Sequence, residues 1–227
     1  MGIEKKKNRI NKVKNKFDTS IIEKEESFLH ELLEIGFIVG IALLIALVFG
    51  TYVTMTREVK GVSMQPTYNN YADYNQYDSQ VWDTVRITRV SVIKRGDVIV
   101  CDAPKLGKLI IKRVIAVGGD TLEFRKADGG WVEVWLNDNK IDEPYINKDG
   151  NGRPLFSLSE RWQYGLNEKI TVKKGCYFVM GDNRNNSQDS RFSDVGFVPK
   201  KDVDGKVYLY VPKGGTFLSA LWKKAFG

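Results

Sequence analysis

The longest apolar segment of the chain runs from Ile35 to Met55 and contains no charged residue. A helix of about 20 apolar residues is long enough to span a bilayer. A cleavable signal peptide is the main alternative, but its apolar region is usually about 7–15 residues long and ends in an A-x-A-like site, which is missing here. The sequence therefore predicts one transmembrane anchor at residues 35–55, with residues 21–34 as a polar helical extension of it.

Basic residues gather ahead of the anchor, between positions 5 and 16. The positive-inside rule therefore places residues 1–34 in the cytoplasm and the chain beyond about Thr56 outside the cell membrane. The formal net charge is +7, but positive and negative residues are mixed over the rest of the chain. This distribution does not indicate a basic face for nucleic acid, and we expect no nucleic-acid partner.

Beyond the anchor, short β-branched runs alternate with turns rich in Gly, Asn and Asp, and no long amphipathic helix interrupts them. Strands are predicted at 98–101, 109–117, 121–124, 131–136, 171–172, 176–180 and 206–211, after a weaker β pattern from about residue 80. We expect a mostly β fold, with a single transmembrane helix followed by an extracytoplasmic all-β domain. Its β core would comprise residues 56–124 and 171–227, and the more polar residues 125–170 would form a smaller inserted β lobe.

Ser63 follows soon after the anchor, between Val62 and Met64. Pro66 fixes the chain just beyond it and ends any helix there. An isolated serine of this kind is far more often a plain loop residue than a nucleophile. A catalytic role for Ser63 requires a base elsewhere in the chain.

Lys112 is a candidate for that base, because it interrupts an otherwise apolar predicted strand. Alternation along the strand places it on one face with Ile110 and Val114. On an edge strand its charge would simply extend into solvent. If the strand were internal, burial would lower the pKa of the amine towards neutrality. The only histidine, His30, precedes the anchor, so a Ser-His-Asp triad beyond the anchor is excluded and a Ser-Lys pair is the alternative.

A dense polar block, Met180-Gly-Asp-Asn-Arg-Asn-Asn-Ser-Gln-Asp-Ser-Arg191, follows a predicted strand. By itself it is typical of a solvated turn. Together with the Ser63-Met-Gln-Pro-Thr67 motif, Arg95-Gly-Asp97 and Lys112-Arg113, in that order after one anchor, it resembles the bacterial type I signal peptidases, a family of Ser/Lys-dyad serine proteases. The motifs span residues 61–191, and several separated motifs in order are much more specific than one.

The resemblance implies a membrane-bound endopeptidase in which Ser63 is the nucleophile and Lys112 the general base. It implies that Ser187 helps to orient the lysine amine, and that Met64 and Ile111 form walls of the pocket for a small side chain. The polar residues expected to brace the site are Asp182, Arg113, Asp189 and Arg191. Gly61 stands where many members have a second serine that contributes to the oxyanion hole, so only backbone N–H groups, chiefly that of Ser63, can be expected here.

Two loops depart from the family pattern. These departures bear on loop geometry and substrate preference, and not on the Ser-Lys pair. Gly118-Gly119-Asp120 replaces the usual Pro-Gly-Asp after the strand of the base, and the segment from Phe192 to Gly196 is longer than usual.

A Tyr-rich stretch at 68–77, with tyrosines at every third position, forms either a membrane-interface rim or a surface loop. The C-terminal apolar residues either pack on the β core or contact the membrane; they are Phe217, Leu218, Leu221, Trp222 and Phe226.

The expected partners are the lipid bilayer and secretory preproteins whose signal peptides carry small residues at −1 and −3. No metal or other cofactor is needed for this chemistry. Cys101 and Cys176 are expected to be small core residues rather than a bridge. Two alternatives remain: another membrane-anchored Ser/Lys processing peptidase, of the pilin or pro-protein type, and a non-catalytic membrane-anchored β binding module.

Overall fold

The computed structural model describes residues 28–70 and 82–226. Contacts divide the chain into two units, Met1–Tyr52 and Val53–Gly227. The first contains a helix, Phe28–Val48, that is long and apolar enough to cross a membrane. The helix continues as a π-helical turn, Phe49–Val53, and strand β1 begins at Thr54. The anchor expected at 35–55 is therefore displaced: the helix starts earlier, and residues 54 and 55 belong to β1, where they pair with β2.

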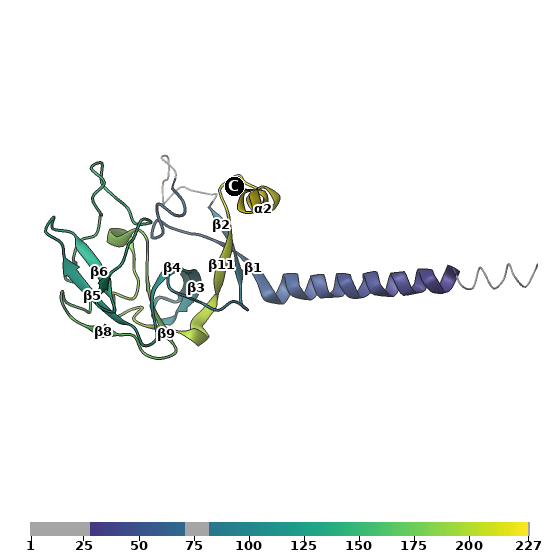
Figure 1. The fold of residues 1–227 in the computed structure, drawn as a ribbon, viewed down its shortest axis with the longest axis horizontal. Coiled ribbons are helices and arrows are strands. Elements are labelled where there is room, and N and C mark those ends of the chain that lie inside the picture. The colour runs from purple at the N-terminus through teal and green to yellow at the C-terminus, as the bar shows by residue number, and fades with distance from the viewer. Residues whose placement is uncertain (1–27, 71–81, 227) are drawn as a thin grey trace, which may run out of the picture. The chain divides into compact units, whose positions relative to one another are not determined.

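The second unit is built on a seven-stranded antiparallel sheet in the order β1-β2-β11-β3-β4-β9-β10 (Figure 1). The strands are β1 Thr54–Glu58, β2 Thr84–Thr88, β3 Val98–Ala103, β4 Lys108–Val117, β9 Cys176–Met180, β10 Val198–Pro199 and β11 Val203–Val211. β3 and β4 form a hairpin through a short 3₁₀ turn, Pro104–Leu106, which Gly107 closes in a left-handed conformation. The predicted β pattern is confirmed.

Strand β4 lies between β3 and β9 and is therefore internal to the sheet. Lys112 pairs with Ile99 of β3, one position from the open end of the hairpin. Ile110, Ile111 and Val114, its neighbours along the strand, are all buried. The arrangement excludes the edge-strand alternative, in which the lysine side chain would extend into solvent.

A second sheet, in the order β7-β6-β5-β8, follows β4 in the chain. Its strands are β5 Thr121–Lys126, β6 Val132–Leu136, β7 Asn139–Lys140 and β8 Ile170–Thr171. The boundaries expected for the inserted lobe, at residues 125 and 170, thus fall inside β5 and β8. Leu122 and Phe124 lie before the first boundary, but they pair with β6 and so belong to the second sheet. Phe124, Phe156 and Phe178 share one buried cluster, so this sheet and the main sheet have a common core.

Two further clusters form the rest of the core of the main sheet. One contains Met64 with Ile111, and the other contains Cys101 with Val114. Both cysteines are free thiols, Cys101 buried and Cys176 half-buried. Burial raises the pKa of the Cys101 thiol to about 12, so it stays protonated near neutral pH. The expectation of unbridged, structural cysteines agrees with this arrangement.

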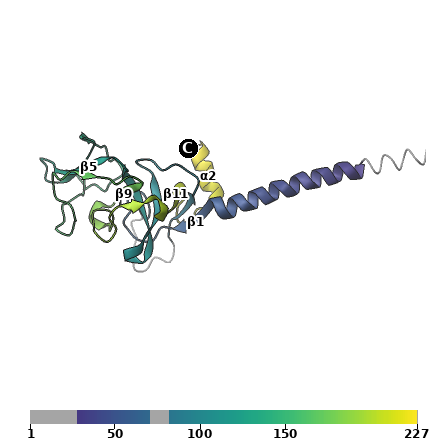
Figure 2. The same cartoon turned by 90° about the horizontal axis from the view of Figure 1, so that it is seen from below.

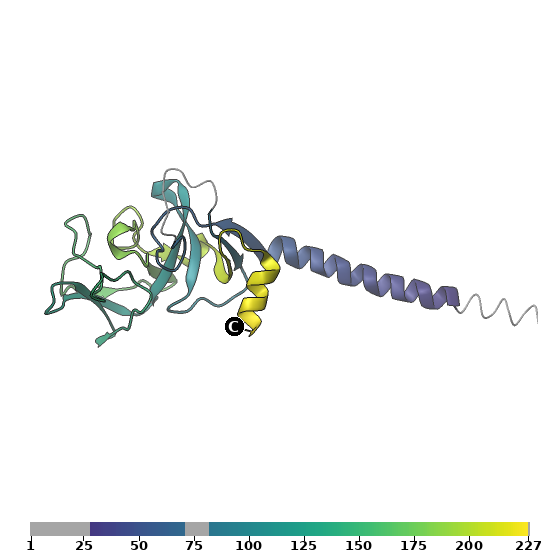
Figure 3. The same ribbon diagram turned by 90° about the horizontal axis from the view of Figure 1, so that it is seen from above.

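Helix α2, Phe217–Phe226, follows β11 and contacts it (Figures 2 and 3). Ala220 is buried, whereas Leu218 is 76% and Trp222 68% exposed. Of the two alternatives for the C-terminal residues, burial in the β core is not observed for the Leu218 and Trp222 side chains, and contact with the membrane stays a prediction. In the Tyr-rich stretch, Tyr68 is buried and its ring lies against Tyr210, 5.2 Å between centroids. Tyr71, Tyr74 and Tyr77 lie outside the described residues.

Candidate active site

Ser63 and Lys112 meet in the second unit. The Lys112 Nζ donates a hydrogen bond of 2.7 Å to the Ser63 Oγ and one of 2.8 Å to the backbone carbonyl of Ile111. Ser63 is half-buried in the turn that follows β1, and Lys112 is only 3% exposed. The lysine side chain is almost completely enclosed, and its amine lies beside the serine hydroxyl.

Burial lowers the pKa of Lys112 from 10.5 to about 8, because the charged amine loses its water. The negative charge of Asp189 opposes this shift. An amine with a pKa near 8 is partly neutral under physiological conditions and can accept a proton from a hydroxyl 2.7 Å away. A serine and a poised base in hydrogen-bond contact are the parts needed for nucleophilic catalysis.

The segment that follows β9, residues 181–191, is called the polar turn below. The Asn183 N–H donates to the Ser63 carbonyl at 3.1 Å, and the Asn183 side-chain amide donates to the Val62 carbonyl at 3.1 Å. Gly181 packs so closely that an added Cβ would overlap the Ser63 carbonyl and the Ser187 hydroxyl. The polar turn therefore fixes the backbone on which the Ser63 hydroxyl stands.

Ser187 lies in the polar turn and is buried against Gly181. Within the described residues no hydrogen bond joins its hydroxyl to the Lys112 amine. The second acceptor of the amine is the Ile111 carbonyl instead. The expected contact between Ser187 and Lys112 is thus not made in this structure, and the orienting role of Ser187 stays a prediction.

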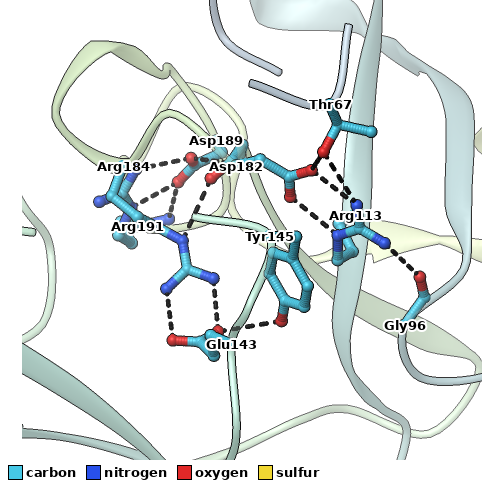
Figure 4. Close-up of polar contacts among 10 residues, drawn as sticks. Thr67, Gly96, Arg113, Glu143, Tyr145, Asp182, Arg184, Asp189 and Arg191 are labelled. Carbon is cyan, nitrogen blue, oxygen red and sulfur yellow. Dashed lines mark hydrogen bonds and ion pairs between the residues drawn. The ribbon is translucent and has the colours of Figure 1, made fainter. Parts of the chain in front are cut away.

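Arg113, next to Lys112, and Asp182, in the polar turn, form a bidentate ion pair with bonds of 2.8 and 2.6 Å (Figure 4). The Thr67 hydroxyl also donates to Asp182, and Arg113 donates to the Gly96 carbonyl at 2.8 Å. Asp182 is fully buried. One ion pair thus joins strand β4, the polar turn and the segment that contains Ser63.

Asp189 and Arg191 form a second bidentate pair within the polar turn, with bonds of 2.8 and 2.7 Å, and both side chains are 0% exposed. Asp189 also accepts the Gly181 N–H at 3.0 Å. Burial acts to raise the pKa of Asp189, but the charge and hydrogen bonds of Arg191 outweigh it and hold the pKa below its usual range. The structure therefore brings all four predicted polar framework residues into two pairs around the polar turn.

Three residues of this network were not predicted. Arg184 of the polar turn is fully buried, donates at 2.8 and 2.5 Å to the two carboxylate oxygens of Glu143, and donates at 3.1 Å to the Gly181 carbonyl. The Tyr145 hydroxyl donates to Glu143 at 3.1 Å. The sequence shows Arg184 inside the polar block, but nothing local indicates a partner 41 positions away.

A second unpredicted pair, Asn69 and Asp83, supports the chain just before Ser63. The Asn69 side-chain amide donates to the carbonyls of Val59 and Gly61, at 2.5 and 2.9 Å. Asp83 accepts the Asn69 N–H and the Tyr210 hydroxyl. Asn69 has a left-handed backbone with φ of 54°, which asparagine tolerates better than most residues.

A groove of about 680 Å³ passes over Ser63 and Lys112. Its lining comes from residues of 56–63 and 106–112, from Val85 and Val100, and from Asn186 and Gln188 of the polar turn. Ile111 lines the groove as expected. Met64 does not: it is 1% exposed and packs in the core with Ile111 and Val100.

Among residues 28–70 and 82–226, no group of three or more His, Cys, Asp or Glu is placed to hold a metal ion. His30 lies on the helix Phe28–Val48 of the first unit and faces Glu34 at 3.4 Å.

Comparison with known proteins adds sequence evidence. The model of the family described as "Signal peptidase, peptidase S26" matches residues 32–211. Signal peptidase I P of Bacillus subtilis subsp. natto is 32% identical over 185 residues, covering 80% of this chain and 89% of that protein. Signal peptidase I of Bacillus licheniformis is 31% identical over 168 residues, covering 73% and 80%. A solved signal peptidase I from Enterococcus faecalis V583 is 28% identical, with a TM-score of 0.40, over 52% of this chain and 99% of that chain.

Proposed function

The chain belongs to the S26 signal peptidase family, and on this premise we propose which of its residues carry out the cleavage. It is a serine endopeptidase that removes signal peptides from secretory preproteins. In our proposal Ser63 is the nucleophile and Lys112 the general base. The observation that carries it is the 2.7 Å hydrogen bond between a buried lysine amine and a half-buried serine hydroxyl.

The reaction begins when neutral Lys112 accepts the hydroxyl proton of Ser63 as the Oγ attacks the carbonyl carbon of the scissile bond. The Ser63 N–H stabilises the oxyanion, since Gly61 offers no hydroxyl for this. The protonated amine of Lys112 then gives its proton to the leaving nitrogen, and an ester with Ser63 remains. Lys112, neutral again, activates the water that hydrolyses this ester and restores the serine.

The groove supports binding of a substrate segment beside the catalytic pair, because its lining includes Ser63, Lys112 and residues of β1 and β4. In the proposal, small residues at −1 and −3 enter its shallow parts, with Ile111 as one wall. Met64 acts from behind as packing for Ile111. Asp182, Arg113, Asp189 and Arg191 hold the polar turn in place, and Ser187 orients the Lys112 amine once substrate has displaced the bond to Ser63.

The helix Phe28–Val48 supports membrane anchoring. We place residues 1–34 in the cytoplasm and the second unit outside the membrane, because the basic cluster lies ahead of the helix. The exposed Leu218 and Trp222 of α2, beside Lys223 and Lys224, support an additional contact with lipid.

The test is cleavage of a preprotein in detergent by the full chain. Ser63→Ala and Lys112→Ala are each expected to lower kcat by at least about 10³-fold, as expected for parts of a catalytic unit. Ser91→Ala and Lys126→Ala change an exposed serine and an exposed lysine elsewhere in the second unit, and they should cleave at the wild-type rate. Wild-type cleavage by both site variants rules out the proposed dyad.

A further inference from the structure

Glu143 and Tyr145 lie in the segment after β7, outside the polar turn and outside the lining of the groove. From there they contact two arginines, Arg184 and Arg113 (Figure 4). Glu143 binds Arg184 of the polar turn with two hydrogen bonds. The Tyr145 ring lies under Arg113, 4.1 Å from the guanidinium carbon to the ring centroid. Arg113 is the residue after Lys112, so the two contacts reach both halves of the site.

Arg184 connects Glu143 to Gly181, which lies against Ser63. Its guanidinium is fully buried and its Nε donates to the Gly181 carbonyl at 3.1 Å. Gly181 in turn packs against the Ser63 carbonyl and the Ser187 hydroxyl without room for a methyl group. A shift of Arg184 therefore disturbs its hydrogen bond to Gly181, and a movement of Gly181 towards Ser63 or Ser187 would displace them.

Tyr145 fixes the orientation of the carboxylate. Burial, and next the charge of Glu143, raise the pKa of the Tyr145 hydroxyl, so it remains protonated and donates to Glu143 at 3.1 Å. Glu143 thus accepts from Arg184 and from Tyr145 together, while the Tyr145 ring holds Arg113 by a cation–π contact.

We propose that Glu143 and Tyr145 are positioning residues that couple the second sheet region to the catalytic pair, by holding Arg184 and Arg113 and through them Ser63. This inference rests on the proposed roles of Ser63 and Lys112. Neither residue touches the groove, so their effect falls on the geometry of the chemical step and not on substrate binding. A misplacement of about 1 Å at a catalytic group can cost about 10²-fold in rate.

The test measures kcat and KM of the full chain with a preprotein substrate for Glu143→Gln. This change keeps the size of the side chain and removes its charge from the pair with Arg184. The matched control is Glu123→Gln, which removes the carboxylate charge of another bidentate pair, with Arg125, from β5 of the same sheet region. We expect kcat to fall about 10- to 100-fold for Glu143→Gln with KM within twofold, and both constants within twofold for Glu123→Gln. If kcat falls equally in both variants, a general loosening of the fold is the cause, and the proposal is overturned.

The pH profile separates positioning from a change in the burial of Lys112. Glu143 is not among the groups that shift the Lys112 pKa. For Glu143→Gln the plateau of kcat should fall while the acidic limb stays in place. A limb that moves to higher pH shows that Lys112 has become hydrated, which overturns the proposal.

Tyr145→Phe keeps the test decisive if Glu143→Gln does not fold. It removes only the hydroxyl that donates to Glu143 and leaves the ring under Arg113. We expect kcat about three- to tenfold lower with KM unchanged, and a wild-type kcat contradicts the proposal. Ser63→Ala, assayed alongside, separates the two hypotheses: an inactive Ser63→Ala with fully active Glu143 and Tyr145 variants refutes only the positioning role, whereas an active Ser63→Ala refutes the catalytic roles themselves.

Discussion

The Nζ of Lys112 donates to the Oγ of Ser63 at 2.7 Å, although the two residues are 49 positions apart in the chain. The lysine comes from an internal strand and the serine from the turn after β1. The lysine is only 3% exposed, so the proton affinity of its amine is set mainly by burial. Both the rate and the stability of the enzyme should therefore depend on the pH at which Lys112 loses its proton.

The rate of cleavage should rise with pH through an apparent pKa near 8, because Lys112 must be neutral to act as the base. Asp189 raises the pKa of Lys112, so Asp189→Asn should move this acidic limb to lower pH. Asp138→Asn changes an exposed aspartate and should leave the limb in place. The measurement is the pH dependence of kcat/KM. A limb that moves to higher pH in Asp189→Asn contradicts the assignment of the limb to Lys112.

The stability of the folded enzyme should also depend on the charge of Lys112. Between about pH 8 and 10.5 the folded chain has released a proton that the unfolded chain still holds, so the free energy of unfolding rises with pH. Lys112→Met has no such proton. The free energy of unfolding of the wild type minus that of Lys112→Met should therefore rise by up to roughly 3 kcal/mol across this pH range. Urea unfolding of both proteins at several pH values measures it, and a difference that is flat with pH argues against a buried, shifted lysine.

Gly181→Ala should lower kcat by about 10²-fold, because the added methyl group overlaps the Ser63 carbonyl and the Ser187 side chain and must displace one of them. Gly165→Ala is the matched control. Its Cβ would meet only the Glu168 carboxylate, at 3.8 Å, and the variant should cleave within twofold of wild type. Steady-state kinetics on both variants, with thermal unfolding to confirm folding, decides the matter. Full activity in Gly181→Ala shows that the polar turn does not constrain Ser63.

Asp189→Asn should destabilise the fold by about 3–5 kcal/mol, because it leaves the fully buried Arg191 guanidinium without a carboxylate. Asp138→Asn breaks the exposed pair with Lys169 and should leave the free energy of unfolding almost unchanged, because solvent screens this pair. The difference is measured by urea denaturation at pH 7. Similar losses in the two variants contradict a stabilising role for the buried pair.

Local sequence patterns were enough to predict the main helix and strands of this fold. The apolar run indicates a helix of membrane-spanning length, and the β-branched runs indicate β3, β4 and β9 close to their observed bounds. These predictions succeed because each depends on residues only a few positions apart. The boundaries succeed less well: β1 takes residues 54 and 55 from the expected anchor, since pairing with β2 favours a strand there.

The candidate pair could also be named from the sequence, because Ser63, Lys112 and the polar block are recognisable by composition and order. Only the tertiary structure decided that β4 is internal, that Met64 packs behind the groove while Ile111 lines it, and that Glu143 and Arg184 meet. These contacts join side chains tens of positions apart, and no local pattern specifies them. They follow from the order in which strands pair, and that order also determines which charges lose their water and hence where Lys112 titrates.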